Sequence, residues 1–447
     1  MASNIANIGK VAELRSRLFF TLFVLLLYRL GIFIAVPGTS PEAMRQAMDQ
    51  TGGGLLGLFS MFSGGGLDQV SVFALGVMPY ISSSIIVQLL TVVVPSLDRL
   101  KKEGEGGTRK INQYTRYGTI ILGIIQGIGV TSYIAGMNTQ AGTPVAESSG
   151  FWFYFVSIST LMTGSLLLMW MGEQIQERGI GNGTSIIIFA GIVAQIPSHV
   201  LKTLSMSDIG SGEGGSDLST PKLLMVLAII IGVIGAVVFF ERGQRRIPVR
   251  YAKKVVGTRM YGGQNTYLPL KINTAGVIPP IFASSLLMFP AMLAGIFPGS
   301  SVQDWLSLHL RPGQMVYTLV YVALILFFCF FYTAVVFNPI DVADNMKKFG
   351  GFIPGIRAGK KTAEYIDRVL SRITLGGAFY IAAVCVLPVF LQTEFNVPFA
   401  FGGTSILIVV GVALDTVQQV ESHLITHNYE GFGGPSGARV KGRRARS

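Results

Sequence analysis

The chain has 447 residues, of which 50% are hydrophobic and only 13% are charged, and its mean hydropathy is +0.55. A soluble domain is typically about 25% charged, so this chain has too little polar surface to cover a water-soluble globule of its size. The composition argues against a soluble protein and favours one that has the lipid bilayer as its solvent. The formal net charge of +12 is interpreted below from the positions of the basic residues.

The cysteines and histidines give no pattern for a disulfide framework or a metal site. Cys329 and Cys385 both lie inside apolar runs, and the four histidines are scattered along the chain. A structural metal site needs about four ligands at characteristic spacings, which this sequence does not contain. We therefore expect no metal and no cofactor.

The first apolar run, 18–36, follows Lys10, Arg15 and Arg17 and could be mistaken for a signal peptide. It is longer than the roughly 7–15 residues usual for the apolar core of a signal, and no small-residue cleavage site follows it. We interpret it as a retained first membrane span.

Long apolar windows recur along the rest of the chain. A transmembrane helix needs about 20 mostly apolar residues. The windows that satisfy this requirement are 18–36, 70–95, 117–137, 151–171, 184–202, 222–241, 273–297, 315–337, 373–391 and 401–420. The sequence thus predicts an all-α integral membrane protein of about ten transmembrane helices.

The basic residues alternate from loop to loop. Of the 35 Lys and Arg residues, 30 lie in the N-terminus, the tail and every second loop, whereas only Arg45 and Arg311 lie in the opposite set of loops. Basic residues accumulate on the cytoplasmic side of membrane proteins, so both termini are predicted to be cytoplasmic. The excess positive charge is explained by this topology and requires no nucleic-acid partner.

Five spans in each half predict two inverted halves. We place the N-terminal half at 1–202, the C-terminal half at 203–420 and a cytoplasmic tail at 421–447. Inverted halves commonly place the functional site at their interface.

Glycine triplets flank a short apolar segment between the first two spans. Residues 55–62 are apolar but too few to cross a membrane, and glycines at 52–54 and 64–66 provide flexible joints. Such a segment either folds into the centre of the protein or lies on the membrane surface. The residues alone leave both alternatives open.

Two loops, 242–272 and 338–372, are much longer than the roughly 2–8 residues usual between bundle helices. Each carries a dense cluster of Lys and Arg. Long basic loops are typical of a docking site for a large, partly acidic partner such as RNA or a motor protein. The alternative is a solvated anchor that touches lipid headgroups.

Catalytic and transport motifs are missing from the sequence. It contains no phosphate-binding loop of the GxxxxGK[S/T] type and no persuasive nucleophile–base arrangement, so we expect no enzyme activity. Within the spans the clearest ionisable residues are Arg29 and Asp415, which we interpret as structural. An ion-coupled secondary transporter of small solutes is the main alternative function, and an intramembrane enzyme is a third.

Several sequence stretches resemble the bacterial SecY family, the pore subunits of the Sec protein translocon, and they occur in family order over nearly the whole chain. They are MFSGGG at 61–66, FALGVMPYIS at 73–82, KKEGE at 101–105, QYTRYG at 113–118, GEQI at 172–175, ERGIGNG at 177–183, ERGQRR at 241–246, LPLK at 268–271, FFCFFY at 327–332 and FGGT at 401–404.

The resemblance implies two five-helix halves hinged around an hourglass pore, with a short plug helix near 58–70. The implied plug residues are Leu58, Phe59, Met61, Phe62, Gly64, Gly65, Gly66 and Leu67. The implied ring of aliphatic side chains at the constriction is Val77, Ile81, Ile188, Ile281 and Ile408. The implied polar residues of a lateral gate are Ser82, Ser83, Gln88, Ser284 and Ser285. Valine at position 77 departs from the isoleucine usual in the family and is expected to widen the ring slightly.

The same resemblance implies a protein-conducting channel of the bacterial plasma membrane. The channel would pass unfolded secretory polypeptides across the membrane and release transmembrane helices sideways into lipid. Implied partners are SecE- and SecG-like small subunits, the SecA ATPase, the ribosome and precursor polypeptides. The implied docking residues are Arg245, Arg246, Arg259, Arg357 and Tyr429, of which Arg259 fits the family pattern least well.

Overall fold

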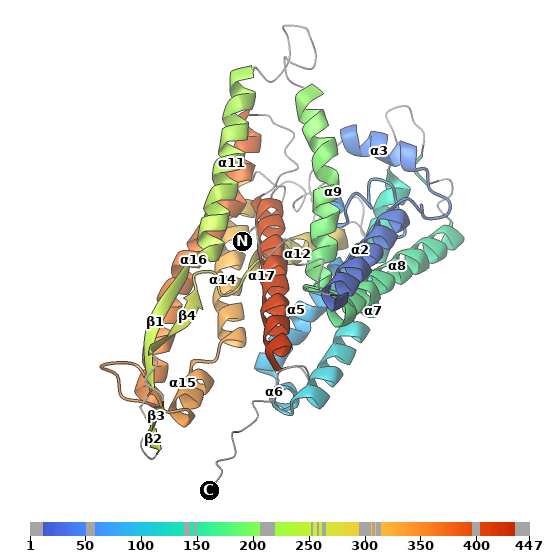
Figure 1. Ribbon diagram of the computed structural model, residues 1–447. Helices are drawn as coiled ribbons and strands as arrows, with labels where there is room; N and C mark the ends of the chain where they lie inside the picture. Colours follow the sequence, from blue (N-terminus) through green and yellow to red (C-terminus); the bar gives the residue numbers. More distant parts are fainter. Residues whose placement is uncertain are drawn as a thin grey trace.

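The computed structural model describes residues 12–50, 59–137, 144–146, 150–205, 220–251, 254–256, 259–261, 265–294, 305, 309, 314–395 and 403–433. Within these ranges, ten long helices correspond to the ten predicted spans (Figure 1). They are α2 (Ala12–Ile32), α5 (Met78–Val93), α7 (Glu105–Gly136), α8 (Phe151–Arg178), α9 (Gly183–Ser205), α11 (Thr220–Arg242), α12 (Ile278–Ala294), α14 (Met315–Val336), α16 (Lys360–Phe395) and α17 (Gly403–Gly433).

Seven of these helices are long and apolar enough to span a membrane on their own, counting only the described residues. An eighth span results if α5 and the short helix α6 (Pro95–Lys102) are taken together, although the two are bent by 99°. Helix α2 carries four charged residues and α12 has only 17 residues. Both nevertheless coincide with predicted windows, so the ten-span prediction accounts for every long helix described.

The predicted span limits differ from the observed helices mainly on the basic side. Helix α7 begins at Glu105 rather than 117, and α16 begins at Lys360 rather than 373. Hydropathy detects only the part of a helix that lies in lipid, whereas the backbone hydrogen bonds continue into water at no extra cost. The window that began at 70 was wrong at its start, because residues 70–77 form turns and the helix begins at Met78.

Local sequence signals explain the short helices. Val94 precedes Pro95 and has extended backbone angles, because the proline ring disfavours helical geometry in the residue before it. This extended residue separates α5 from α6.

Helix α15 (Pro339–Lys348) is preceded by its N-cap residue Asn338, whose side chain accepts a hydrogen bond from the amide of Ile340. Helix α3 (Pro41–Gln50) lies toward the opposite end of the molecule from α6 and α15 (Figure 1).

The two long basic loops contain strands that the sequence analysis did not foresee. In the first loop, β1 (Gln244–Tyr251) pairs with β4 (Asn265–Lys271), and β2 (Lys254–Val256) pairs with β3 (Arg259–Tyr261), all antiparallel. In the second loop, β5 (Gly351–Phe352) pairs with the end of β1, so the strand order is β4-β1-β5. The two loops therefore form one structure, which Figure 1 shows beside α15 at one end of the molecule.

A small hydrophobic core holds this structure together. Strand β1 alternates, with Ile247 and Val249 buried between exposed neighbours, as expected for a strand with one covered face. These side chains cluster with Leu270 of β4, Ile353 after β5, and Ile366 of α16. The second loop thus packs on the hairpin of the first through apolar contacts as well as strand pairing.

The main core runs through the helical part of the molecule, and the outside of the helices remains apolar. Helix α2 exposes Phe19, Leu22 and Phe23 to more than half of their area, and only 11% of the most apolar stretch of α11 is buried. In water such surfaces would cause aggregation, whereas a bilayer covers them with acyl chains. The chain is a multi-pass membrane protein.

We predict that Ile366→Ala loosens the basic loops without unfolding the membrane helices. Ile366 is completely buried in the small core, and truncation of a buried isoleucine costs about 2–5 kcal/mol. The measurement is the rate of tryptic cleavage within 338–372, which we expect to rise. The matched control is Ile340→Ala, because that side chain is 62% exposed. Equal cleavage rates for the two variants would contradict the packing described here.

Candidate functional site

The five aliphatic residues of the implied ring come from four helices. Val77 immediately precedes α5 and Ile81 lies in its first turn, whereas Ile188, Ile281 and Ile408 lie on α9, α12 and α17. All five are at most 6% exposed and belong to one hydrophobic cluster. Aliphatic side chains offer no ligand to an ion, so a constriction made of them resists ion flow by excluding water.

The implied plug segment packs into the same cluster. Residues 59–62 form a single helical turn and 63–70 continue in turns, so the helical part is shorter than predicted. Phe59, Met61, Phe62 and Leu67 are at most 5% exposed and share the cluster with the ring residues. Of the two alternatives for this segment, the described residues follow the inward-folded one. Leu58 lies outside the described residues.

Side chains from two helices hydrogen-bond to backbone carbonyls of this segment. Tyr28 of α2 donates to the carbonyl of Ser63 over 3.1 Å, and Arg29 donates to the carbonyl of Gly64 over 3.0 Å. Gln195 of α9 donates to the carbonyl of Ser60 over 3.3 Å. These contacts give the buried peptide groups partners that water would otherwise supply.

A third helix contacts the segment through a weaker polar bond. The hydroxyl of Ser405 on α17 lies 2.9 Å from the sulfur of Met61. Ser405 is 1% exposed, so this contact is inside the protein. The segment is therefore held by α2, α9 and α17 together.

Gly64 is required by both its backbone angle and its surroundings. Its φ is +69°, and a Cβ at this position would lie 2.5 Å from the hydroxyl of Tyr28 and 2.8 Å from the backbone of Gly191. The segment therefore approaches α2 and α9 at a distance that only glycine permits.

Val70 has a φ of +46°, an unusual value for a β-branched residue. It is fully buried, its amide donates to the carbonyl of Leu67, and its carbonyl accepts from the amide of Val36 over 2.8 Å. A strained residue persists only where its surroundings fix it. Val70 is therefore held by its buried contacts in a backbone conformation that valine otherwise avoids.

The polar residues of the implied lateral gate differ in their contacts. Ser285 of α12 lies 3.7 Å from the sulfur of Met78 on α5, and this bond crosses the seam between the two helices. Ser83 instead donates to the carbonyl of Thr115 on α7 over 2.7 Å. Gln88 and Ser284 bond within their own helices, to Ser84 and to the carbonyl of Ile281. Ser82 is half-buried.

Sequence reasoning missed several residues of this site. Tyr28, Gln195 and Ser405 contact the plug segment, and Met78 contacts the seam, yet none was predicted. Each is a polar or sulfur-containing residue within an apolar run, and this was the only sequence feature that could have indicated a contact at the site. We interpreted Arg29 as structural from the sequence, and its hydrogen bond to the carbonyl of Gly64 is a structural contact.

Four of the five implied docking residues lie on the structure formed by the two basic loops, 242–272 and 338–372. Arg245 and Arg246 are exposed on β1, and Arg357 is exposed between β5 and α16. Arg259 lies in β3 and Tyr429 in the last part of α17, and the side chains of both are outside the described residues. Because β5 joins β1, the two predicted basic loops present one surface instead of two.

Metal binding has no support within the described ranges. No three His, Cys, Asp or Glu side chains there lie close enough together to hold a metal ion. Asp415, one of the two charged residues placed in spans, is 62% exposed and lies 3.9 Å from Lys271.

Comparison with known proteins gives a consistent result. The sequence profile of the SecY family matches residues 71–417. The protein translocase subunit SecY of Escherichia coli (strain K12) is 51% identical over 425 residues, which cover 94% of this chain and 94% of that protein.

Two solved structures share the fold. One is described as showing that the plug domain of SecY stabilises the closed state of the translocation channel, and it superposes with a TM-score of 0.66 at 18% identity over 93% of this chain and 94% of the other. The other, Sec61 in a canine ribosome–channel complex from the endoplasmic reticulum, gives 0.61 at 16% identity with the same coverage.

We predict that Arg29→Met loosens the plug segment. The variant removes a charged donor from the Gly64 carbonyl, and hydrogen bonds to charged groups contribute about 1.5–3 kcal/mol. The measurement is disulfide yield between Met61→Cys and Ser405→Cys in a chain with Cys329→Ala and Cys385→Ala. We expect the yield to fall severalfold.

The control for this experiment is Arg15→Met, which removes an exposed arginine from the same helix. Arg29→Lys retains a donor and should give an intermediate yield. A yield that is unchanged in Arg29→Met would show that Arg29 does not hold the segment.

Proposed function

The chain belongs to the SecY family, and we propose on that basis that it forms the pore of a protein-conducting channel. The channel passes unfolded secretory polypeptides across the bacterial plasma membrane and releases transmembrane helices into lipid. The observation that carries this proposal is the joint burial of aliphatic residues from α5, α9, α12 and α17 with the segment 59–70.

The physical properties of that cluster suit a channel for many different polypeptides. A ring of aliphatic side chains makes no specific hydrogen bonds, so it is indifferent to the side chains that pass it. When no polypeptide is present, the same ring excludes water and the plug segment fills the space beside it. The plug role described for the SecY structure of similar fold supports this reading.

Sideways release requires a seam that opens easily. The contact between Ser285 and Met78 is the polar bond that crosses from α12 to α5 among the predicted gate residues. Interhelical polar contacts in membranes contribute only about 0.6 kcal/mol on average. An apolar segment that enters the pore gains more than this by moving into lipid. The proposed hinge joins the halves 1–202 and 203–420.

The single surface formed by the basic loops 242–272 and 338–372 is the proposed docking site for the partner that drives translocation. Its exposed arginines fit acidic protein surfaces and the phosphates of ribosomal RNA. We propose that it binds the SecA ATPase and the ribosome, the latter in keeping with the ribosome complex solved for Sec61. SecE- and SecG-like subunits complete the proposed assembly, and both termini are placed in the cytoplasm by the distribution of basic residues.

The transporter alternative finds no support in these contacts. A transporter for ions or charged solutes needs charged groups at a midplane site. Arg29 bonds to a backbone carbonyl of the plug segment, and Asp415 is exposed beside Lys271. Neither provides a binding site for a coupled ion, and we propose no catalytic activity for the chain.

The test is disulfide crosslinking of a stalled precursor to the ring. We predict that a precursor with a single cysteine, halted during translocation, crosslinks to Ile281→Cys and Ile408→Cys in a chain with Cys329→Ala and Cys385→Ala. The reaction should depend on SecA and ATP, because only an inserted polypeptide reaches the ring.

The matched control is Ile325→Cys, which introduces cysteine at an equally buried isoleucine on α14. Crosslinking at Ile325 as strong as at the ring would refute the ring assignment. Solute uptake that follows the protein, without any precursor engagement, would establish the transporter alternative.

A further inference from the structure

A short segment connects the basic hairpin to the proposed gate helix. Strand β4 ends at Lys271 and α12 begins at Ile278, so only residues 272–277 separate the two. Each residue spans at most about 3.6 Å, so a connection of this length limits how far the two can separate. If the segment is stiff, a displacement of the hairpin base therefore also displaces the start of α12.

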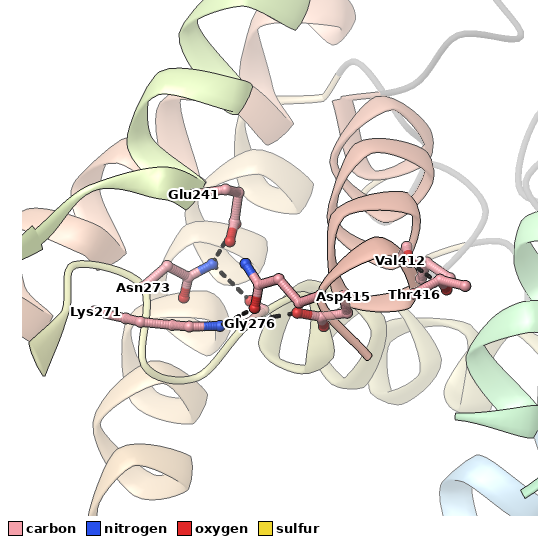
Figure 2. Close-up of polar contacts among 8 residues, drawn as sticks. Glu241, Lys271, Asn273, Gly276, Val412, Asp415 and Thr416 are labelled. Carbon is pink, nitrogen blue, oxygen red and sulfur yellow. Dashed lines mark hydrogen bonds and ion pairs between the residues drawn. The ribbon is translucent and has the colours of Figure 1, made fainter. Parts of the chain in front are cut away.

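A buried hydrogen-bond pair stiffens this segment. Asn273 is 4% exposed, and its side-chain nitrogen lies 2.6 Å from a carboxyl oxygen of Glu241 and 3.0 Å from the carbonyl oxygen of Gly276 (Figure 2). Glu241 is near the end of α11, directly before β1. Hydrogen bonds with one ionised partner are shorter and about twice as strong as neutral ones. The pair thus ties the base of the hairpin to the turn that starts α12.

Neighbouring contacts fix the two sides of this base. The amide of Ile272 donates to the carbonyl of Gly243 over 3.0 Å, and a Cβ at Gly377 of α16 would lie 2.7 Å from the carbonyl oxygen of Ile272. Lys271 donates to Gln418 of α17 over 3.1 Å. The base of the hairpin and the start of the segment are thus held against α11, α16 and α17.

The far end of this connection reaches the seam. Helix α12 packs against α5 and α7, and its Ser285 bonds to Met78 of α5. A continuous set of contacts therefore runs from the exposed arginines of β1, through Asn273, to the α5–α12 seam. Binding at the surface and opening of the seam are separate events that this path joins.

We propose that Glu241 and Asn273 are positioning residues that transmit partner docking on the basic hairpin to opening of the α5–α12 seam. The proposal rests on the proposed channel function and adds the residues that couple its two parts. In this proposal both residues act through α12 and not on the translocating polypeptide. Their function is to make α12 move with the hairpin.

The experiment measures seam opening and partner binding in the same assembly. The seam is reported by disulfide formation between Met78→Cys and Ser285→Cys, with Cys329→Ala and Cys385→Ala, in vesicles that also contain the small partner subunits. Purified SecA with a non-hydrolysable ATP analogue is the docking probe. In the parent chain, SecA should lower the rate of disulfide formation.

The test variants change the donor and acceptor without changing side-chain size. Asn273→Asp places a second carboxylate against Glu241 and removes the donor to Gly276. We expect it to bind SecA as the parent does but to lose the seam response on the order of tenfold, as expected for losing a hydrogen bond to a charged group. Glu241→Gln retains an acceptor and should respond as the parent does.

The double variant Glu241→Gln with Asn273→Asp supplies the discriminating result. Its glutamine can donate to the new aspartate, so part of the seam response should return, although the Gly276 carbonyl remains without its donor. A merely structural role would change SecA binding and the seam response together, whereas the proposal predicts that only the seam response is lost and recovered. Failure of the double variant to recover would overturn the proposal.

Two further results would overturn it. A normal seam response in Asn273→Asp would show that coupling does not pass through this pair, and loss of SecA binding would show that the pair only shapes the docking surface. Failure of the channel function itself is recognised separately, because the parent chain would then show no SecA-dependent translocation.

Discussion

The largely buried backbone of residues 59–77, which is helical only at 59–62, imposes the strongest physical requirement on this structure. Within a bilayer, irregular backbone is tolerated only where protein surrounds it and satisfies its hydrogen bonds. Internal bonds such as those of the Gly65 amide to Ser60 and the Ser71 amide to Gly66 meet part of that demand. Tyr28, Arg29 and Gln195 supply further donors. The hydrogen bonds that these side chains donate to the carbonyl groups of the segment therefore also fix the positions of α2 and α9.

The same requirement is visible in the kind of contacts that hold the segment. The segment is held by individually modest hydrogen bonds and by burial of a few apolar side chains, rather than by a continuous helix. Val70 adds a strained backbone angle that persists only because its surroundings fix it. In the proposed channel, a segment held in this way closes the pore when every contact is made and yields when a polypeptide replaces those contacts.

The basic end of the molecule lies outside the apolar region, so ordinary strand pairing and a small apolar core are enough to hold it together. Its two loops are joined by pairing of β5 with β1 and by a small apolar core around Ile366. A partner that binds either loop therefore acts on both. Hydrogen bonds join the base of this structure to α11 and α17 (Figure 2). The carbonyl of Ile272 also lies close to Gly377 of α16, so the basic surface is in direct contact with the membrane helices.

The sequence by itself determined the membrane class, the ten apolar helices, the basic clusters and the motifs that indicate the family. These are local or compositional properties: hydropathy over about 20 residues and the positions of Lys and Arg do not depend on packing. The aliphatic residues 77, 81, 188, 281 and 408 could be named only by family resemblance, since any isoleucine in a span looks like core.

Only the tertiary structure decided the helix ends, the pairing of β5 with β1, and the partners of Arg29, Ser83 and Asn273. These depend on which residues distant in sequence come together. Ser83 was placed at the seam by its position on α5, yet it bonds to α7 because a hydroxyl takes the nearest buried carbonyl. Asn273 lies 32 residues from Glu241, and no sequence period indicates that pair.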